Sequence, residues 1–370
     1  MESPKNILIC PLDWGLGHVT RCIPIIQKLY NHKQQVYIAC TKPQYHFIQE
    51  EFPQLIWIPC ASINIHYSTN ALTSLDLIKL VPKILYGIKR DQCNIEKWIH
   101  KYSIDLIISD SRFGCFSKKV PSIIITHQIK LELPKVFKWA EKIVFNRIKK
   151  YIRHFDRCWI PDTNDMPNFA GELTSKYSLN GKSVFVGILS RFDAFTFTEK
   201  PKEYTYEIIG IVSGPEPQRT LFADILLSQM KQIKKPCLLV LGKVDDTKKT
   251  ENEGMVTVYN YLNSEELYYA IQSSRYIIAR SGYSTIMDLI SLRRLAILVP
   301  TPGQTEQEYL AQYYDQRKMF VVVHQNELQL QDAISQLSVY QLFYHYEPSH
   351  IIDNELESLI GNAPSALKIN

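Results

Sequence analysis

The chain has 370 residues, of which 45% are hydrophobic and 21% charged, and its formal net charge is +5 at pH 7. This length exceeds one ordinary core and predicts about two domains, while the composition excludes a disordered chain. No early segment resembles a signal peptide, and no apolar run reaches the roughly 18 residues that span a bilayer, so we expect a cytoplasmic protein.

Short apolar runs alternate with amphipathic segments through the first half, which is typical of parallel strands covered on both faces. The predicted strands are NILICPL (6–12), QQVYIAC (34–40), LIWIPC (55–60), IDLIISD (104–110), SIIITHQ (122–128) and RCWIPD (157–162). Such alternation predicts βαβ units and a doubly wound sheet. The pattern is interrupted between about residues 164 and 202, where turn residues and charges collect.

The alternation then resumes and predicts a second doubly wound α/β domain. Its predicted strands are YEIIGIVSG (206–214), CLLVLG (237–242), MVTVYNYL (255–262), YIIAR (276–280), LAILVP (295–300) and MFVVVH (319–324). We therefore predict two Rossmann-like domains, 1–187 and 188–338, that face a cleft, followed by closing helices in 339–370. Eight cysteines, none in a C-x-x-C pair, indicate reduced buried thiols and no zinc site.

The stretch PLDWGLGHVTRCIPI (11–25) joins the first strand to the first helix. Ligands of such sheets bind beyond the carboxyl ends of the strands, and the following helix offers free N–H groups to an anion. Gly15 and Gly17 permit a sharp turn and a close approach, and His18 adds an imidazole. The pattern differs from both dinucleotide and phosphate-binding loops. The alternative is a tight turn in which His18 is only a polar cap.

Three strand ends of the second half carry polar residues before a helix. The first has Ser213, Gly214 and Arg219; the second has Arg280, Ser281, Gly282, Ser284, Thr285 and Asp288; the third has Gln304, Gln307 and Glu308. Hydroxyls, N–H groups and arginines at such ends suit phosphates, a carboxylate suits a vicinal diol, and amides suit sugar hydroxyls. The alternatives are proline-ordered turns, compensation of a helix dipole and solvated helix starts.

The motifs RSGYSTIMDL, PGQTEQEYLA and YLNSEEL together resemble the donor site of GT-B glycosyltransferases. The group they are most similar to contains the bacterial UDP-N-acetylglucosamine transferase that completes the lipid-linked peptidoglycan precursor. Within that group, WGLGH and SGPEPQRT resemble an uncharacterised bacterial branch. The resemblance extends over roughly residues 5 to 335.

The resemblance implies roles for residues of the second domain. Asp288 would bind the ribose hydroxyls, although relatives usually have Glu there, and the backbone of Leu262 would meet the base. Gly282, Ser284 and Thr285 would face the diphosphate, and Gln307 and Glu308 would stand where relatives carry paired glutamines that touch the donor sugar. In the first domain, His18 matches a proposed catalytic base, and His127 and Gln128 of THQ would face the acceptor side of the cleft.

An inverting transfer needs a base for the acceptor hydroxyl and positive potential on the departing diphosphate. Histidine titrates near neutrality and can serve as the base, with the strand-end carboxylates Asp13 and Asp110 as alternatives. Two helix N-termini, together with Arg219 and Arg280, can stabilise the leaving group without a metal or other cofactor. We find no convincing D-x-D metal motif.

The segment 130–157 contains nine Lys/Arg and three Asp/Glu, interleaved with apolar residues at helical spacing. Such a segment suits an anionic membrane surface, and the alternative is an ordinary helix with a basic outer face. Charge alone would also suit nucleic acid, but that leaves the second-domain motifs unexplained.

The sequence therefore predicts an inverting, metal-independent transferase that moves a sugar from a UDP-sugar to a lipid-linked or cell-envelope glycan. It would be a monomer or weak dimer in the cytoplasm, with attachment to the inner membrane face as a further hypothesis. The alternatives are a nucleotide-sugar epimerase or hydrolase of the same fold and a catalytically silent nucleotide-binding protein.

Overall fold

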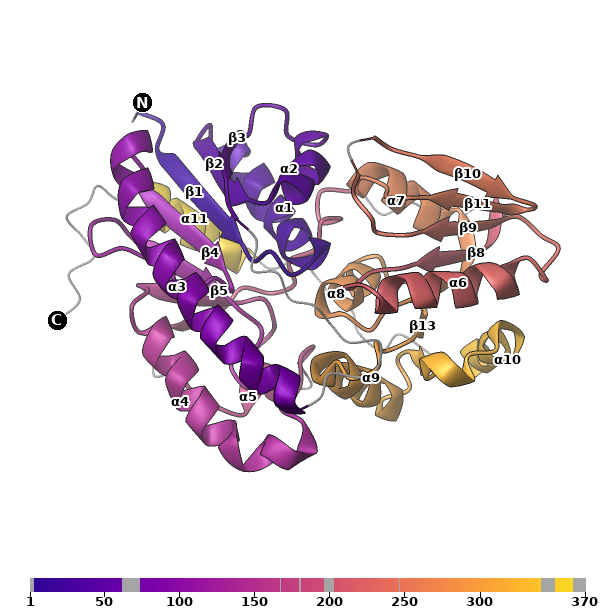
Figure 1. The fold of residues 1–370 in the computed structure, drawn as a ribbon. Helices are drawn as coiled ribbons and strands as arrows, with labels where there is room; N and C mark the ends of the chain where they lie inside the picture. The colour runs from indigo at the N-terminus through magenta and orange to yellow at the C-terminus, as the bar shows by residue number, and fades with distance from the viewer. Residues whose placement is uncertain are drawn as a thin grey trace.

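Two α/β domains, each built on one seven-stranded sheet, face each other in the computed structural model of the chain (Figure 1). The structure describes residues 3–61, 74–166, 168–179, 181–195, 203–245, 247–340 and 350–361. The predicted fold class is confirmed. The first sheet ends at Phe185 and the second begins at Tyr206, on either side of the predicted boundary at residues 187 and 188.

The N-terminal sheet is parallel throughout, with the strand order β3-β2-β1-β4-β5-β6-β7. Its strands are β1 (Asn6–Pro11), β2 (Gln35–Cys40), β3 (Ile56–Pro59), β4 (Leu106–Asp110), β5 (Ser122–Ile125), β6 (Arg157–Ile160) and β7 (Ser183–Phe185). The helices of this half are α1 (Leu16–Asn31), α2 (Lys42–Gln49), α3 (Ser74–Tyr102), η1 (Lys135–Ala140), α4 (Glu141–Ile152) and α5 (Glu172–Ser175).

The C-terminal sheet has the order β10-β11-β9-β8-β12-β13-β14, and β10 pairs antiparallel to β11. Its strands are β8 (Tyr206–Ile211), β9 (Cys237–Val240), β10 (Thr250–Glu253), β11 (Val256–Tyr259), β12 (Ser274–Ala279), β13 (Ile297–Leu298) and β14 (Val321–Val322). The helices are α6 (Gln218–Met230), α7 (Ser264–Gln272), α8 (Tyr283–Ser291), α9 (Thr305–Gln316), η2 (Gln325–Glu327), α10 (Leu330–Gln336), η3 (Leu337–Val339) and α11 (Ile351–Gly361).

Every predicted strand coincides with an observed one, but β7 and β10 were missed. The sequence of β10, TENE, contains no apolar residue, and most of the strand is exposed. Strand β7 has three residues and lies where the alternating pattern is interrupted. Both strands pair at a sheet edge, so they need less apolar character than the central strands.

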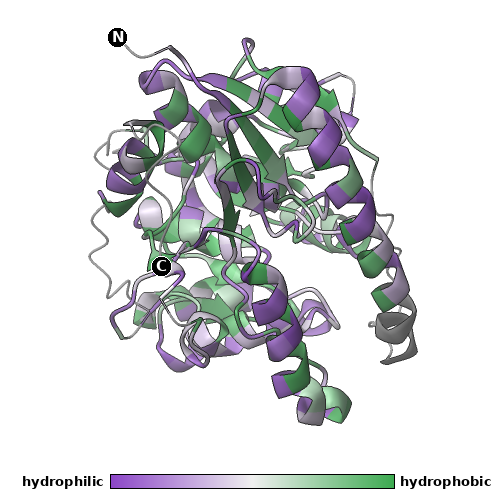
Figure 2. Ribbon diagram, turned by 90° about the vertical axis from the view of Figure 1, so that its left-hand side faces the viewer, coloured by the Kyte–Doolittle hydropathy of each residue, from purple (hydrophilic) through white to green (hydrophobic). Residues whose placement is uncertain are grey.

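Strand β1 shows why the central strands read as continuous apolar runs. Ile7 and Ile9 pack beneath α1 on one face, while Leu8 and Cys10 pack with Ile95 of α3 on the other. Burial of each such side chain contributes about 1.5–3 kcal/mol relative to exposure. Figure 2 shows the same arrangement, with hydrophobic strands inside and hydrophilic outer helix faces.

The C-terminal helix α11 crosses back to the N-terminal domain, where it lies beside the first sheet (Figure 1). Ile352 and Leu356 join the core beneath α1, and Asp353 forms an ion pair of 2.6 Å with Lys28. Within the predicted closing segment 339–370 the structure has α11, whereas 341–349 and 362–370 lie outside the described residues.

The two domains also share a packed interface on the segment that follows β6. The hydroxyls of three C-terminal-domain tyrosines donate to carbonyl groups of this segment: Tyr283 to Pro161, Tyr313 to Asn168 and Tyr314 to Phe169. Phe169 and Leu173 enter the C-terminal core. The segment that follows β6 is therefore held by both domains.

Candidate active site

The first turns of α1 and α8 touch at the boundary between the two domains. Gly17 is the second residue of α1, Ser284 is the second residue of α8, and the Ser284 hydroxyl donates to the Gly17 carbonyl at 2.9 Å. Each helix begins just beyond the carboxyl end of a parallel strand, the edge where ligands of such sheets bind. The structure thus brings two predicted regions together at one point.

Gly15 is the N-cap of α1 and has φ +92° and ψ −175°. Only glycine adopts this backbone region readily, so the residue type is dictated by the turn. Position 17 favours glycine for a different reason, because a Cβ atom there would lie 3.3 Å from the Ser284 hydroxyl oxygen. Gly17 therefore makes room for the opposite domain rather than for the imidazole beside it.

His18 and Asp110, predicted separately as bases, are in contact. Nδ1 of His18 lies 3.1 Å from Oδ2 of Asp110, which ends β4. Arg21, one turn after His18, reaches the same carboxylate through Nη2 at 2.6 Å and Nε at 3.0 Å. Asp13, the third predicted base, lies half-buried in the loop between β1 and α1, and its role stays a prediction.

Asp110 is fully buried, and Arg21 is 2% exposed. Burial alone would raise the pKa of Asp110, but the charge of Arg21 and the contact with His18 hold that pKa well below its usual value. The carboxylate is therefore ionised across the physiological pH range. The side chain of His18 is 18% exposed, so its ring is the member of this group that solvent reaches.

The structure pairs His127 and Gln128 with the opposite domain, and their predicted acceptor-side role stays a prediction. Nδ1 of His127 lies 2.8 Å from Nη1 of Arg21, and Nε2 lies 2.7 Å from Oε1 of Glu306 in α9. The amide of Gln128 donates to the other oxygen of Glu306. His127 is 5% exposed, and both of its ring nitrogens contact groups of the protein.

Asp288, the predicted ribose ligand, is buried within α8. Its carboxylate accepts from the Ser190 hydroxyl at 2.8 Å and from Nε of Arg191 at 3.0 Å. Burial raises the pKa of Asp288. The Asp288 carboxylate therefore holds the interdomain linker, and its contact with a ribose stays a prediction. Leu262 is also buried, and its contact with a nucleotide base stays a prediction.

Arg280, the predicted diphosphate contact, lies inside the C-terminal domain, and that contact stays a prediction. Its side chain is fully buried, and burial lowers its pKa to about 9. The guanidinium donates to oxygens of Gln218, Val299, Pro300 and Gln325 and lies over the ring of Phe222. It therefore ties together the segments that follow β8, β13 and β14.

The remaining donor-side residues mainly shape their own loops. Arg219 pairs with Glu216 at 2.6 Å, which offsets its charge. Ser281 donates to the Gln307 carbonyl at 2.9 Å, and the Gln307 side chain accepts from the N–H of Thr301 at 2.9 Å. In the same loop, Gln307 also donates to the Gln304 side chain, and Glu308 accepts from the N–H of Gly303. Contacts of Ser213, Gly214, Gly282, Thr285, Gln304, Gln307 and Glu308 with a donor stay predictions.

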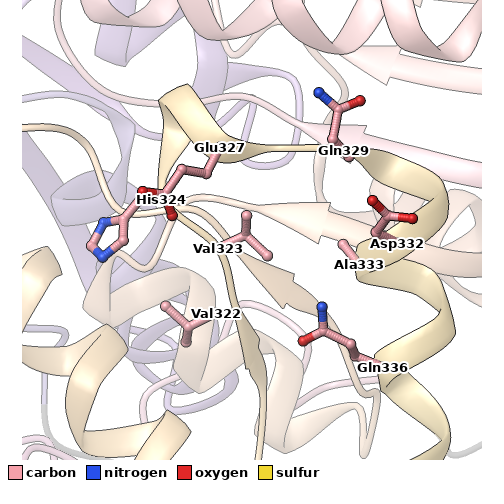
Figure 3. Close-up of a pocket in the computed structure, with 8 residues that line it drawn as sticks. All are labelled: Val322, Val323, His324, Glu327, Gln329, Asp332, Ala333 and Gln336. Carbon is pink, nitrogen blue, oxygen red and sulfur yellow. The ribbon is translucent and has the colours of Figure 1, made fainter.

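A hollow of about 320 Å³ lies apart from these residues, between β14 and α10 (Figure 3). His324, Glu327 and Asp332 line it with polar groups, while Val322 and Val323 form its floor. Its lining includes none of the residues predicted from the sequence, so the hollow and the helix junction at Gly17 are separate features.

Comparison with known proteins identifies the second half of the chain. Residues 211–357 match the glycosyltransferase family 28 C-terminal domain. The second half of the chain is therefore similar to a glycosyltransferase domain. An uncharacterized glycosyltransferase of Methanosarcina acetivorans is 23% identical over 325 residues, which cover 82% of this chain and 81% of the relative.

A second relative, from Sulfurihydrogenibium sp., is a UDP-N-acetylglucosamine–N-acetylmuramyl-(pentapeptide) pyrophosphoryl-undecaprenol N-acetylglucosamine transferase. It is 33% identical over 153 residues, which cover 39% of this chain and 40% of the relative. These matches support a glycosyltransferase, as the sequence predicted.

Solved structures show that the glycosyltransferase has the GT-B fold. The glycotransferase of kitacinnamycin aligns with a TM-score of 0.58 at 14% identity, over 97% of this chain and 95% of that one. SnogD from Streptomyces nogalater also aligns with a TM-score of 0.58, at 11% identity, over 97% of this chain and 100% of that one.

Sequence reasoning missed Arg21, Glu306 and Tyr283 in this glycosyltransferase. The ring of Tyr283 stacks on His127 with centroids 4.0 Å apart and planes at 7°. Arg21 could have been found, because residues three apart share a helix face and Arg21 follows His18 at that spacing. Glu306 offered no such signal, since its partners lie in the other domain.

Proposed function

We propose that the chain is an inverting, metal-independent glycosyltransferase that moves a sugar from a UDP-sugar to a lipid-linked or cell-envelope glycan. The observation that carries this proposal is the contact between the first turns of α1 and α8, with His18 beside it. A base and two helix N-termini then lie at one point, where an acceptor hydroxyl and a nucleotide diphosphate would have to meet.

His18 is the proposed base, and Asp110 is its partner. When Nδ1 carries the proton and donates to Asp110 at 3.1 Å, Nε2 keeps a lone pair that can take the proton of an acceptor hydroxyl. The ionised, buried carboxylate then stabilises the imidazolium that forms. The acceptor oxygen attacks the anomeric carbon as the bond to the diphosphate breaks.

The leaving diphosphate would receive positive potential from the backbone. A helix N-terminus carries roughly half a positive charge and presents unpaired N–H groups. α8 begins with Tyr283, and its first turn contains no acidic residue. Donors that are already oriented cost no reorganisation during the reaction, which is why we propose a step that needs no metal.

The choice of a UDP-sugar is supported by the Sulfurihydrogenibium relative, whose name specifies UDP-N-acetylglucosamine transfer to a lipid-linked precursor. That match covers 39% of this chain, so the donor class is better supported than the sugar. UDP-N-acetylglucosamine is the first donor to test, alongside other UDP-hexoses.

A lipid-linked acceptor is supported by exposed apolar groups on the N-terminal domain. Val136, Trp139 and Ile143 project from η1 and α4, and Val81, Leu85 and Tyr86 project from α3. In Figure 1 the start of α3 and η1 lie toward the same end of this domain. Exposed Lys135, Lys138 and Lys142 surround the first group, and such a mixture suits an anionic lipid surface. No helix among the described residues is long and apolar enough to cross a membrane.

The deciding experiment is transfer by the unmodified protein and by His18→Ala, with a UDP-sugar panel and a lipid-diphosphate sugar acceptor. We expect His18→Ala to lower kcat by about 10² to 10⁴, the usual share of general base catalysis, and to leave UDP affinity unchanged. NMR of the product should show an inverted anomeric carbon, and a chelator should not reduce the rate.

Two results would contradict the proposal. Conversion of the donor without an acceptor would indicate an epimerase or hydrolase. If His18→Ala keeps near-normal turnover and Asp13→Asn loses turnover, the catalytic base is Asp13.

A further inference from the structure

Arg21 links the proposed base to the opposite domain. Its Nη2 lies 2.9 Å from Nδ1 of His18 and 2.6 Å from Oδ1 of Asp110, while its Nη1 lies 2.8 Å from Nδ1 of His127. A guanidinium has only donors, so Arg21 can donate to the carboxylate and to any ring nitrogen that carries no proton. Its buried position leaves it little room to change one contact without disturbing the others.

This arrangement fixes the tautomer of His127. Because Arg21 can only donate, Nδ1 of His127 must accept, and the ring proton must lie on Nε2. Nε2–H then donates to Oε1 of Glu306 at 2.7 Å. Burial lowers the pKa of His127, which favours this neutral form, and the stacked ring of Tyr283 holds the imidazole plane.

The position of Arg21 matters for His18, because Nδ1 of His18 lies between a donor and an acceptor. Asp110 Oδ2, at 3.1 Å, favours a proton on Nδ1, which leaves Nε2 free to act as a base. Arg21 Nη2, at 2.9 Å, favours an unprotonated Nδ1, which places the proton on Nε2 and blocks that role. The guanidinium therefore influences which tautomer His18 adopts.

The far end of these contacts belongs to the C-terminal domain. Glu306 lies in the first turn of α9, and Tyr283 begins α8, so both reach His127 only when the two domains are seated together. We propose that Glu306, His127 and Arg21 are positioning residues that couple domain seating to the tautomer of His18. The proposed function gives this coupling its purpose, but the contacts can be tested without it.

The test uses Glu306→Ala, Glu306→Gln and a control on the neighbouring residue, Thr305→Val. Glu306→Gln keeps an oxygen for His127 Nε2–H, whereas Glu306→Ala removes it. Thr305→Val deletes a different interdomain hydrogen bond, of 2.7 Å from Thr305 Oγ1 to the Glu132 carbonyl, which does not involve His127. The side chain of Glu306 is 29% exposed and lies on a helix, where alanine is well accommodated.

The first readout is the pair of imidazole ¹⁵N shifts of His18 in the ligand-free full chain, which report the tautomer. We expect Glu306→Ala to change the ratio of the two His18 tautomers although Glu306 does not touch His18, and Glu306→Gln and Thr305→Val to leave that ratio unchanged. Gln128→Met, which removes the amide that holds the other oxygen of Glu306, should give a smaller change in the same direction.

The second readout is steady-state transfer. Glu306→Ala should lower kcat by about 10- to 100-fold, as expected for a misplaced catalytic group, without changing KM for the donor. Unchanged His18 shifts in Glu306→Ala and Gln128→Met would overturn the proposal. So would an equal kcat loss in Thr305→Val, or a loss expressed only in donor KM, which would make Glu306 a substrate contact. If no UDP-sugar supports transfer, the proposed function fails, and the ¹⁵N shifts still decide the positioning role.

Discussion

The hydroxyl of Ser284 donates a 2.9 Å hydrogen bond to the carbonyl of Gly17, so a single serine side chain joins two helix starts from different domains. In Gly17→Ala the new Cβ would lie 3.3 Å from the Ser284 oxygen, closer than an ordinary contact. We expect this variant to lower the melting temperature. Ser284→Ala should relieve part of that loss, because the remaining contact with Cβ is an ordinary 3.6 Å.

Gly15→Ala is the control for Gly17, because a Cβ at Gly15 meets nothing within 4 Å but the residue has φ +92°. Backbone strain alone should cost about 1–3 kcal/mol there, and Ser284→Ala should not relieve it. Differential scanning calorimetry of each glycine variant, with and without Ser284→Ala, separates steric crowding from backbone strain. Equal rescue of both glycine variants would contradict the assigned reason for Gly17.

Asp110→Asn should destabilise the fold in a pH-dependent manner. It leaves the buried Arg21 without its counter-charge, which typically costs about 3–5 kcal/mol. The pKa of Asp110 is lower in the folded than in the unfolded chain, so its stabilisation is full above the unfolded value of about 4 and fades as the pH falls below it. Urea unfolding should show a large difference between the two proteins at pH 7 that shrinks toward pH 3. A difference independent of pH would exclude the ionised carboxylate as its source.

Asp288→Asn should affect both stability and nucleotide binding. The acid and Arg191 form a largely buried pair, with side chains 8% and 13% exposed, so loss of the charge should destabilise the chain by about 3–5 kcal/mol. If Asp288 also binds a ribose, UDP affinity should fall by about 1.5–3 kcal/mol in calorimetry below the melting temperature. Arg191→Gln is the control, since it breaks the pair but keeps the acid. Unchanged UDP affinity in folded Asp288→Asn would leave Asp288 as a linker anchor alone.

The exposed apolar groups of η1 and α4 should contribute to binding of anionic vesicles. Trp139 and Ile143 are 74% and 62% exposed, so Trp139→Ala with Ile143→Ser should weaken vesicle flotation without lowering stability. A triple change of Lys142, Lys149 and Lys150 to Gln should weaken flotation most at low salt, because exposed charges are screened over about 8–10 Å at physiological ionic strength. Absence of flotation by the unmodified protein would favour a soluble acceptor.

The sequence was sufficient to predict the sheets, because parallel strands buried on both faces leave near-continuous apolar runs. It also placed His18 and Asp110 at the same sheet edge, since the carboxyl ends of neighbouring parallel strands lie together. It could not reveal that Arg280 faces the interior, because an arginine after a strand has the same sequence context whether it meets a ligand or buried carbonyls. From the sequence, Glu306 is likewise an ordinary acidic residue at a helix start, because its partner His127 lies in the other domain.

The return of α11 to the first sheet has a consequence for the order in which a newly made chain can become compact. Ile352 and Leu356, among the last described residues, fill the core beneath α1, which is among the first helices synthesised. During translation the second sheet can acquire all of its strands while the first still lacks part of its apolar packing. The N-terminal domain, although made first, can therefore complete its core only after every strand of the C-terminal sheet has been synthesised.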